Sequence, residues 1–359
     1  MGGQTVVPFG PQHPVLPEPI QVKLTLQDET IVSAVPVFGY CHRGIEKAAE
    51  LNDLSQNVFL LERVCGICSF MHAMTYCQGI EELMGVEIPE RAKYLRVIWS
   101  EIQRLHSHLL WIGCFTDAMG FESLFMQSWR YREMILDLQE RTAGHRVILS
   151  TCTLGGVRRD IDEEKLEVIL NTLKELKPGL DQLARVIEKD YTLRKRCVGI
   201  GTLSRDQAVS LGVVGPMMRA SGIAQDARML RYAAYGNLKF EPVVETAGDS
   251  HARTMVRIRE TFQSIDLIRE AIDKMPQGEI AIKLRGNPTG EVISRVEQPR
   301  GEVMYFIKGN GTKNLERLRV RTPTYANAAS LVVMLPGMTM ADVPILLHTI
   351  DPCFSCTER

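Results

Sequence analysis

Residues 95–110 have the sequence LRVIWSEIQRLHSHLL. Apolar side chains recur in this stretch at steps of three and four residues. They are Leu95, Ile98, Trp99, Ile102, Leu105, Leu109 and Leu110. Such a period is typical of a helix that is buried along one side. We therefore predict a long core helix here, and the rest of the fold follows from what this helix must pack against.

Two further segments carry the same helical period. The first contains Leu166, Ile169, Leu170, Leu173 and Leu176, and the second contains Ile258, Phe262, Ile265, Ile268 and Ile272. Proline removes a backbone donor and clashes with the preceding turn, so Pro178 and Gly179 are expected to interrupt the first of these helices. Several long helices with one apolar stripe each predict a helix bundle.

Both ends of the chain have strand patterns instead. Residues 20–26 alternate between apolar and polar, 27–30 form a polar turn and 31–38 are apolar again, which predicts an antiparallel hairpin. Near the other end, residues 280–284 and 303–307 are short apolar runs separated by Gly and Pro, as in a small second sheet. The predicted fold is a single compact α+β unit, with an N-terminal β region (1–40), a helical core (41–276) and a small β region with the C-terminal segment (277–359).

Composition excludes several classes of function. The 359 residues carry 42 Lys and Arg against 43 Asp and Glu, so the net charge of -1 attracts no nucleic acid. Nine cysteines are too sparse for a disulfide scaffold, which favours a reducing compartment. The most apolar stretch, residues 330–350, contains Pro336, Gly337, Asp342 and Pro344 and is not expected to span a membrane. Docking on a membrane assembly is compatible with all of this.

Four cysteines form two pairs with metal-ligand spacing, Cys65 with Cys68 and Cys353 with Cys356. A structural zinc site or a redox disulfide are the simpler interpretations. Zinc modules usually gather their ligands within a short stretch, whereas 288 positions separate Cys65 from Cys353. A site closed by both ends of a long chain fits an active metal centre better, and thiolates also suit nickel and iron.

The sequence around these pairs resembles a known family. Residues 62–72 (ERVCGICSFMH) and 351–356 (DPCFSC) resemble the two signature motifs of nickel-iron hydrogenase large subunits. Residues 10–14 (GPQHP), 42–47 (HRGIEK), 155–160 (GGVRRD) and 299–302 (PRGE) are similar to the membrane-bound, energy-converting branch, and most similar to the Ech type. The similarity extends over essentially the whole chain.

This resemblance implies a nickel-iron centre whose iron carries carbon monoxide and cyanide. Cys65 and Cys353 would be terminal nickel ligands, and Cys68 and Cys356 would bridge nickel to iron. Dihydrogen would be cleaved heterolytically, with the proton passing first to a terminal thiolate. A metal-bound thiolate is already deprotonated and can accept that proton.

The resemblance also assigns roles to four other side chains. Glu18 would relay protons from Cys353, and Arg300 would hold its guanidinium over the metals. His72 would form a hydrogen bond with a bridging sulfur, and Asp351 would orient either Arg300 or the last loop. Without the resemblance these would be a solvated loop carboxylate, a surface arginine and local hydrogen-bonding groups.

Two positions depart from the family pattern. Ser107 stands where relatives with standalone uptake activity have an aspartate that fixes the active-site arginine. Those relatives also bind magnesium through a C-terminal histidine and a glutamate that matches Glu46, whereas this sequence ends in Arg359. Glu46 is therefore expected either to hold a magnesium ion or to pair with an arginine.

The function implied is that of the catalytic subunit of a ferredoxin-linked hydrogenase that couples reversible cleavage or formation of H2 to proton or other ion translocation, at the cytoplasmic side of the cell membrane. No further cysteine cluster is present, so the resemblance implies a small subunit with a four-iron four-sulfur cluster, together with further iron-sulfur and antiporter-like membrane subunits. The alternative is a metal-free, quinone-binding subunit of a complex I-like NADH or ferredoxin dehydrogenase. Such subunits usually lack both complete cysteine pairs.

Overall fold

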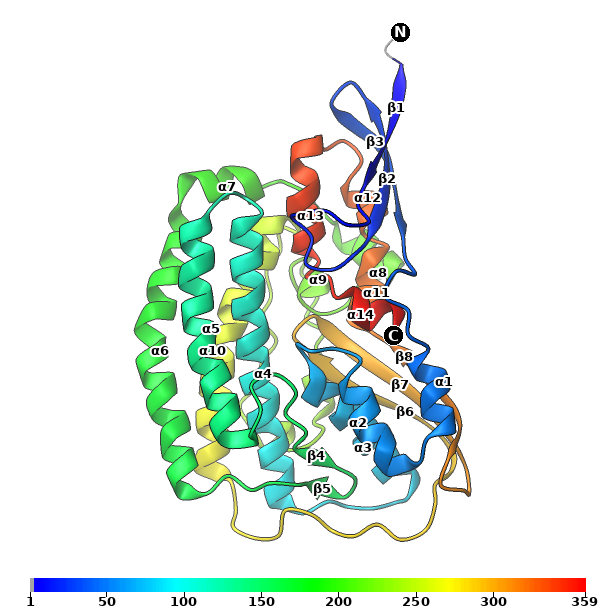
Figure 1. Ribbon diagram of the computed structural model, residues 1–359. Helices are drawn as coiled ribbons and strands as arrows, with labels where there is room; N and C mark the ends of the chain where they lie inside the picture. The colour runs from blue at the N-terminus through cyan, green and yellow to red at the C-terminus, as the bar shows by residue number, and fades with distance from the viewer. Residues whose placement is uncertain (1–2) are drawn as a thin grey trace.

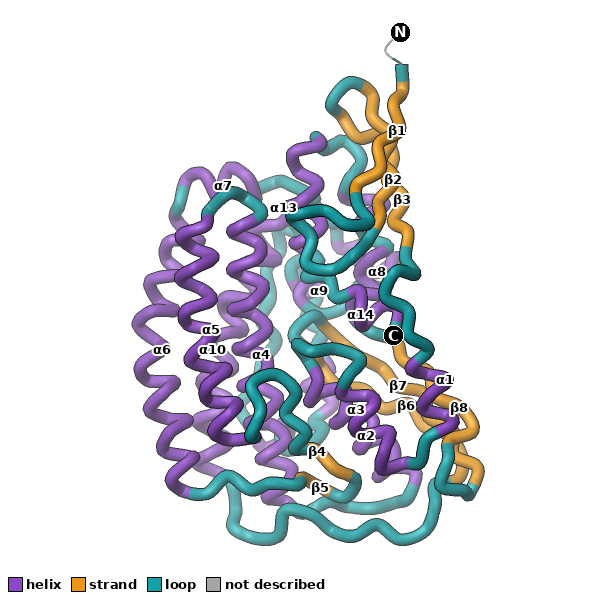
Figure 2. The backbone as a smooth tube through the Cα atoms, in the orientation of Figure 1, coloured by secondary structure: helices purple, strands orange, loops and turns teal. Residues whose placement is uncertain are grey.

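The computed structural model describes residues 3–359. Figure 1 shows a bundle of long helices on one side and a twisted sheet with short helices on the other, while a second sheet near the N-terminus projects beyond both. The tube view in Figure 2 shows that long loops connect these parts. The predicted mixed helix-and-sheet class is confirmed.

The elements have the following bounds. The strands are β1 (Gln4–Phe9), β2 (Gln21–Gln27), β3 (Thr30–Val37), β4 (Cys152–Thr153), β5 (Gly156–Val157), β6 (Thr289–Gln298), β7 (Gly301–Asn310) and β8 (Leu315–Arg321). The helices are α1 (Ile45–Leu51), α2 (Leu54–Glu62), α3 (Ser69–Leu83), α4 (Glu90–Asp117), α5 (Glu122–Ala143), α6 (Glu163–Lys189), α7 (Tyr191–Cys197), α8 (Arg205–Leu211), α9 (Pro216–Arg219), α10 (Ser250–Lys274), α11 (Pro323–Ala328), α12 (Leu331–Met334), α13 (Val343–Thr349) and α14 (Phe354–Glu358). Short 3-10 turns are η1 (Ala227–Leu230), η2 (Tyr235–Asn237) and η3 (Met340–Asp342).

Helix α4 is the central element of the bundle. Its apolar stripe is buried from Leu95 to Leu109, including the large side chain of Trp99, and Leu110 is half-buried; the helix packs against α5 and α10. Its other side is buried as well and carries charged residues, among them Arg96, Glu101 and Arg104. Buried charges must be paired, so α4 brings ion pairs into the middle of the molecule as well as apolar surface.

The predicted interruption at Pro178 and Gly179 is wrong for helix α6. The helix continues through Pro178 and Gly179 as a single helix from Glu163 to Lys189. Apolar side chains on both sides of the proline are buried and hold the two halves in line. Gly179 lets α5 approach closely, because a Cβ atom there would lie 2.3 Å from the Cζ atom of Tyr131. Tertiary packing therefore outweighs the local cost of the proline.

The C-terminal sheet corrects another prediction. Residues 303–307 do lie in a strand, β7, but its neighbours are β6 and β8, which were not predicted. Strands β6 and β7 form an antiparallel ladder from Thr289–Asn310 to Gln298–Gly301, closed by a two-residue turn at Pro299 and Arg300. Residues 280–284 form no strand. They touch Gly156 by a single bridge at Ala281, where the glycine lets the two backbones come close.

The N-terminal sheet has three antiparallel strands in the order β1-β2-β3. Strands β2 and β3 occupy the segments where the alternation suggested a hairpin, and β1 adds an edge that the sequence pattern did not indicate. The buried face of this three-stranded sheet packs on α12 and α13 in an apolar cluster that is separate from the main core. No helix among residues 3–359 has the length and apolarity needed to cross a membrane.

The turn that carries Arg300 is packed against backbone. A Cβ atom on Gly215 would lie 2.3 Å from the Cα atom of Gly301 and 2.4 Å from the carbonyl oxygen of Arg300. Gly215 also has a φ of 67°, which disfavours other residues. The position of Arg300 therefore depends on a glycine that lies 85 residues earlier in the chain.

We predict that Gly215→Ala destabilises the protein by about 1–3 kcal/mol more than Gly199→Ala does, because the added methyl group collides with the Arg300 turn. Gly199 is a matched control, since its φ of 74° is similar and a Cβ atom there meets nothing within 4 Å. Thermal denaturation of the purified proteins measures the difference. Equal melting temperatures for the two variants would contradict the packing argument.

Candidate metal centre

The two cysteine pairs lie on two turns at helix N-termini. Cys65 and Cys68 occupy the turn between α2 and α3, and Cys353 and Cys356 lie at the start of α14 and within it. All four side chains are buried, with at most 1% of each residue exposed. We refer to these residues as the four-cysteine site.

The sulfur atoms converge. The Sγ atoms of Cys65 and Cys353 are 3.5 Å apart, and those of Cys68 and Cys356 are 4.0 Å apart. Cys65, Cys68 and Cys356 all lie within 4.8 Å of one another. Metal-sulfur bonds of about 2.3 Å in a tetrahedral arrangement place sulfur atoms about 3.8 Å apart. The spacing of the Cys65, Cys68 and Cys356 sulfurs therefore fits thiolates around a shared metal ion, and the Cys353 sulfur adjoins this group through Cys65.

The charge of the site also favours a cation. The contact with Cys356 lowers the pKa of Cys353, but the contact with Cys65 and burial outweigh it and raise that pKa to about 11. Burial raises the pKa of Cys356 as well. Four ionised thiols cannot share this interior without compensating positive charge, and bound metal ions supply it. The donor set fits the nickel-iron group that the sequence resemblance implies.

Backbone amides stabilise one of the sulfur atoms. The N–H groups of Ile67 and Cys68 donate to the Sγ atom of Cys65 over 3.2 and 3.4 Å. These donors belong to the turn that leads into α3, and such N-terminal amides favour thiolates.

His72 lies beside the site on α3. Its Nε2 atom is 3.5 Å from the Sγ atom of Cys356, and its Nδ1 atom is 2.8 Å from the hydroxyl oxygen of Tyr305. Burial lowers the pKa of His72 to about 3, so the ring is neutral. If the Tyr305 hydroxyl donates to Nδ1, the ring proton is on Nε2 and points at the sulfur. Tyr305 was not anticipated from sequence, because no local pattern connects β7 with α3.

Glu18 approaches the site from the loop before β2. Its Oε1 atom lies 4.0 Å from the Sγ atom of Cys353 and accepts a hydrogen bond of 2.7 Å from the Ser355 hydroxyl. Its Oε2 atom accepts from the backbone N–H groups of Phe354 and Ser355. Burial and the Cys353 thiol raise the pKa of Glu18 against these hydrogen bonds. The carboxyl group is thus next to a sulfur and disposed to carry a proton.

Arg300 is buried at 2% exposure rather than being a surface arginine. Its Nη2 atom is 2.9 Å from the Oδ1 atom of Asp351, and its Nε–H donates to the carbonyl oxygen of Asp351, also over 2.9 Å. The Ser107 hydroxyl is 3.5 Å from Nη1, at the limit of a hydrogen bond. Asp351 therefore holds the guanidinium, and Ser107 adds at most a weak contact.

Glu46 is paired with arginines. Its Oε2 atom lies 2.7 Å from Nη1 of Arg319, and its Oε1 atom accepts from Nε of Arg359 over 2.8 Å and from the Val320 N–H over 2.9 Å. Both oxygens are therefore engaged by guanidinium groups, which is the pairing alternative for this residue. The pair ties the C-terminal residue to α1 and β8.

Arg43 is a positioning residue that sequence reasoning did not single out by role. Its guanidinium donates to the carbonyl oxygens of Arg63 and Val64, just before Cys65, over 2.9 and 3.0 Å. It also donates to the carbonyl oxygen of Ser355, between the second pair of cysteines, over 2.8 Å. One side chain thereby links both cysteine turns. Only the planar fork of arginine offers donors in several directions at once.

Comparisons with known proteins show the family of the chain. A family model described as "Respiratory-chain NADH dehydrogenase, 49 Kd subunit" matches residues 118–287 and 282–359, and one described as "Nickel-dependent hydrogenase" matches residues 43–114. The chain belongs to this family of hydrogenase and NADH dehydrogenase subunits. The hydrogenase match contains Cys65 and Cys68, and the second NADH dehydrogenase segment contains Cys353 and Cys356.

Relatives of the family cover nearly the whole chain. A "Carbon monoxide-induced hydrogenase" of Rhodospirillum rubrum is 39% identical over 98% of this chain and 99% of its own length. "Membrane-bound hydrogenase subunit alpha" of Pyrococcus furiosus is 38% identical over 98% and 87%. A subunit of the NADH-quinone oxidoreductase of Dehalococcoides mccartyi is 36% identical over 99% and 98%. The predicted family is confirmed, and it contains both hydrogenase and dehydrogenase subunits.

A solved structure has the same fold. One chain of the membrane-bound sulfane sulfur reductase, described as an archaeal respiratory membrane complex, matches with a TM-score of 0.94 and 31% identity. The match covers 99% of this chain and 98% of that chain. Relatives of this chain are thus subunits of membrane complexes.

We predict that Tyr305→Phe lowers activity or metal affinity about 10-fold, because loss of the hydroxyl frees the His72 ring from its fixed tautomer. Nickel content and activity of the purified complex measure the effect. Tyr325→Phe is the control, because Tyr325 is exposed on α11. An unaltered Tyr305→Phe enzyme would show that the His72 contact has no role in the site.

Proposed function

We propose that this chain is the catalytic subunit of a membrane-bound, energy-converting nickel-iron hydrogenase. The observation that carries the proposal is the convergence of four buried cysteine sulfurs from the two ends of the chain. A nickel-iron group, when bound there, supplies heterolytic cleavage of dihydrogen. Cys65, Cys68, Cys353 and Cys356 would hold it, with carbon monoxide and cyanide on the iron.

The protein's own residues would handle the proton. The sulfur of Cys353 is the family's first acceptor, and the Glu18 carboxyl group lies 4.0 Å from it. Glu18 sits on a partly exposed loop, so it can pass the proton outward. Its raised pKa keeps it able to bind a proton, which a relay group must do before releasing it.

Two further side chains, one cationic and one neutral, would shape the rest of the site. Arg300, fixed by Asp351, places a permanent positive charge beside the sulfurs. That charge can hold anionic ligands and polarise a substrate without giving up a proton. His72, with its ring proton on Nε2, would donate toward Cys356 and temper the charge on that sulfur.

Electrons would leave through a partner. Within residues 3–359 the only clustered metal-ligand cysteines are those of the four-cysteine site. A small subunit with a four-iron four-sulfur cluster would therefore be needed, followed by further iron-sulfur subunits, ferredoxin and antiporter-like membrane subunits.

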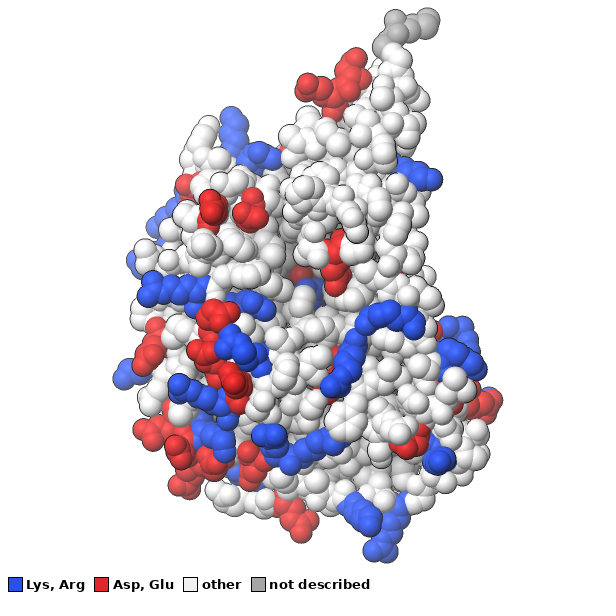
Figure 3. All heavy atoms as spheres, in the orientation of Figure 1, with Lys and Arg blue, Asp and Glu red and all other residues white. Residues whose placement is uncertain are grey.

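Figure 3 shows a face whose centre is hollowed and whose charged side chains gather mainly over the long helices. The peripheral, cytoplasmic placement on a membrane complex belongs to the same proposal.

The second candidate is a metal-free, quinone-binding subunit of a complex I-like dehydrogenase. Its support is the NADH-quinone oxidoreductase relative from Dehalococcoides mccartyi, which covers the chain as fully as the hydrogenases do. It leaves four converging buried cysteines without a role. A structural zinc site would use them but would not need Glu18 or Arg300 beside them.

Elemental analysis of the purified complex tests these alternatives. We expect roughly one nickel per chain, lost in Cys65→Ser and Cys353→Ser together with hydrogen-deuterium exchange activity. Cys197→Ser is the control, because Cys197 lies at the end of α7 with its thiol against the sulfur atom of Met119. Zinc without nickel would support the structural site, and no metal would support the quinone-binding subunit.

The proton relay has its own test. Glu18→Gln is expected to slow hydrogen-deuterium exchange at least about 100-fold, because the amide cannot accept the proton, while nickel content is retained. Glu29→Gln, in the exposed turn between β2 and β3, is the matched control. Unchanged exchange in Glu18→Gln would remove Glu18 from the proton path.

A further inference from the structure

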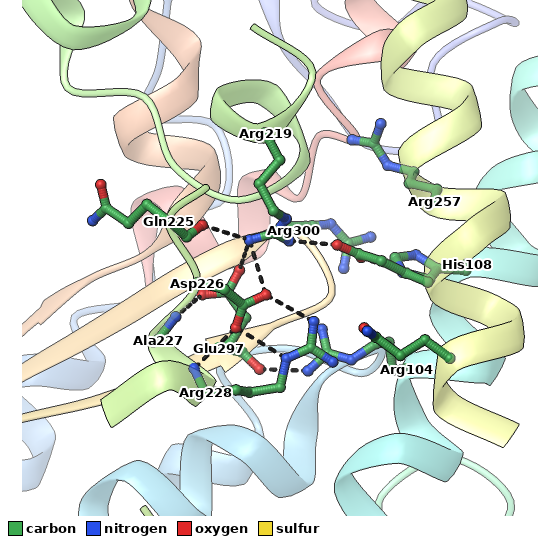
Figure 4. A network of polar contacts seen from close by, with 12 residues as sticks. Arg104, His108, Arg219, Gln225, Asp226, Ala227, Arg228, Arg257, Glu297 and Arg300 are labelled. Atoms are coloured by element: carbon green, nitrogen blue, oxygen red, sulfur yellow. Dashed lines mark hydrogen bonds and ion pairs between the residues drawn. The ribbon is translucent and has the colours of Figure 1, made fainter. Parts of the chain in front are cut away.

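A group of buried charged side chains lies outside the four-cysteine site, and none of the roles described above uses it. We call Glu101, Arg104, Arg219, Asp226, Arg228, Glu260 and Glu297 the buried ion cluster; each is at most 3% exposed. Figure 4 shows several of these side chains converging between β6, α4 and α10.

Arg219 is the centre of the cluster. Its Nη1 atom is 3.0 Å from Oδ2 of Asp226 and 2.8 Å from Oε1 of Glu297. Its Nη2 atom is 2.7 Å from Oε1 of Glu260. Three carboxylates therefore share one guanidinium in the interior, where each additional negative charge is costly.

The other two arginines of the cluster form their ion pairs with Asp226 and Glu101. Arg228 pairs with Asp226 over 2.7 Å and reaches Glu101 over 3.4 Å, and Arg104 pairs with Glu101 over 3.1 Å. In the described part of the chain, the carboxylate of Glu297 has no ion pair except with the shared Arg219. Asp226 has Arg228 as a second partner and Glu260 has His108 at 3.0 Å, whereas the second oxygen of Glu297 accepts only from the Ala227 N–H over 2.9 Å.

The surroundings of Glu297 are charged on every side. Arg219 approaches from α9, Asp226 and Arg228 from the start of η1, and Arg104 from α4, where it donates to the Glu297 carbonyl oxygen over 2.8 Å. Burial and the negative charge of Asp226 raise the pKa of Glu297 to about 7, even though Arg219 lowers it. Burial also acts to raise the pKa of Glu260, but Arg219 and His108 outweigh it and lower that pKa. These opposite directions, together with the ion pairing above, favour Glu297 over Glu260 as the carboxylate that takes up a proton.

The cluster is connected to the four-cysteine site. From Glu260, the chain of charges continues one turn along α10 to Arg257, whose Nε atom is 3.9 Å from Oδ2 of Asp351. Asp351 pairs with Arg300 beside the cysteines. Glu297 also lies only three residues before Arg300, at the end of β6. Charges interact strongly over such distances where water is excluded.

We propose that Glu297 is a proton-loading site, which binds a proton when negative charge is added at the four-cysteine site and releases it when that charge is removed. The proton comes from water and only an O–H bond forms or breaks; the electron comes from the reductant, such as dithionite, that reduces the site. The Tyr232 hydroxyl accepts from the Glu297 N–H over 3.1 Å, and Tyr232 is one of the residues that line a surface pocket of about 530 Å³, so solvent comes within one side chain of the Glu297 backbone. Only one part of this inference rests on the proposed function, namely that reduction adds negative charge at the four-cysteine site.

Infrared difference spectroscopy of the whole complex tests this inference. Reduction by dithionite near pH 7 is expected to produce a protonated-carboxyl C=O band, and a pH-difference spectrum without reductant is expected to show the same band. Glu297→Gln should lose it, whereas Glu291→Gln, an exposed position on the same strand, should keep it. Glu297→Asp should restore a shifted band, which shows that loss in the glutamine variant is chemical and not a failure to fold.

The outcomes separate the two proposals. A carboxyl band that persists in Glu297→Gln when Glu18→Gln is also present, or no such band in a complex whose carbon monoxide and cyanide bands respond to reduction, would overturn the role of Glu297. Absence of those diatomic-ligand bands would instead overturn the proposed function and with it the redox coupling. The pH-difference band would then still decide whether Glu297 binds a proton.

Discussion

The structure depends on bringing four thiol groups from opposite ends of the chain into one buried position. Sulfur atoms at 3.5 and 4.0 Å cannot be held there by the two short turns alone. The guanidinium of Arg43 binds the carbonyls of both turns, and the Arg359–Glu46 pair fixes the end of the chain. The helix bundle and the β6-β8 sheet serve as walls that keep water from this point.

Positive charge is the second constraint on the interior. Arginines buried on α4, α9 and α10 and in the β6-β7 turn lie within a protein whose net charge is -1. Removing one partner of such buried pairs is costly, so the network fixes the relative positions of elements that the apolar core alone would leave free to slide. The same network gives the four-cysteine site an electrostatic connection to groups far from it in sequence. Stability and proton handling thus draw on one set of residues.

Each prediction from the sequence was right or wrong for a physical reason. The stripe around Trp99 predicted α4 correctly because a helix buried along one side must repeat at its own period. The interruption at Pro178 was wrong, since buried leucines on both sides of it and the contact of Gly179 with Tyr131 hold α6 together. The strand at 280–284 was wrong because its apolar residues pair by one bridge instead of a ladder. Among the site residues, Asp351 does hold Arg300, whereas Tyr305 and Arg43 act across the fold and leave no local pattern.

By itself the sequence determined the family and predicted the ligand chemistry, because two CxxC motifs with their flanking residues are local and specific. It also determined where the principal helices lie, since periodicity is a property of neighbouring residues. Only the tertiary structure decided that Glu46 pairs with two arginines, that Ser107 barely reaches Arg300, and that Glu297 shares Arg219 with two other carboxylates. Those facts depend on distances between segments that are remote in sequence. Where charged groups are buried, such short distances between them shift their pKa values.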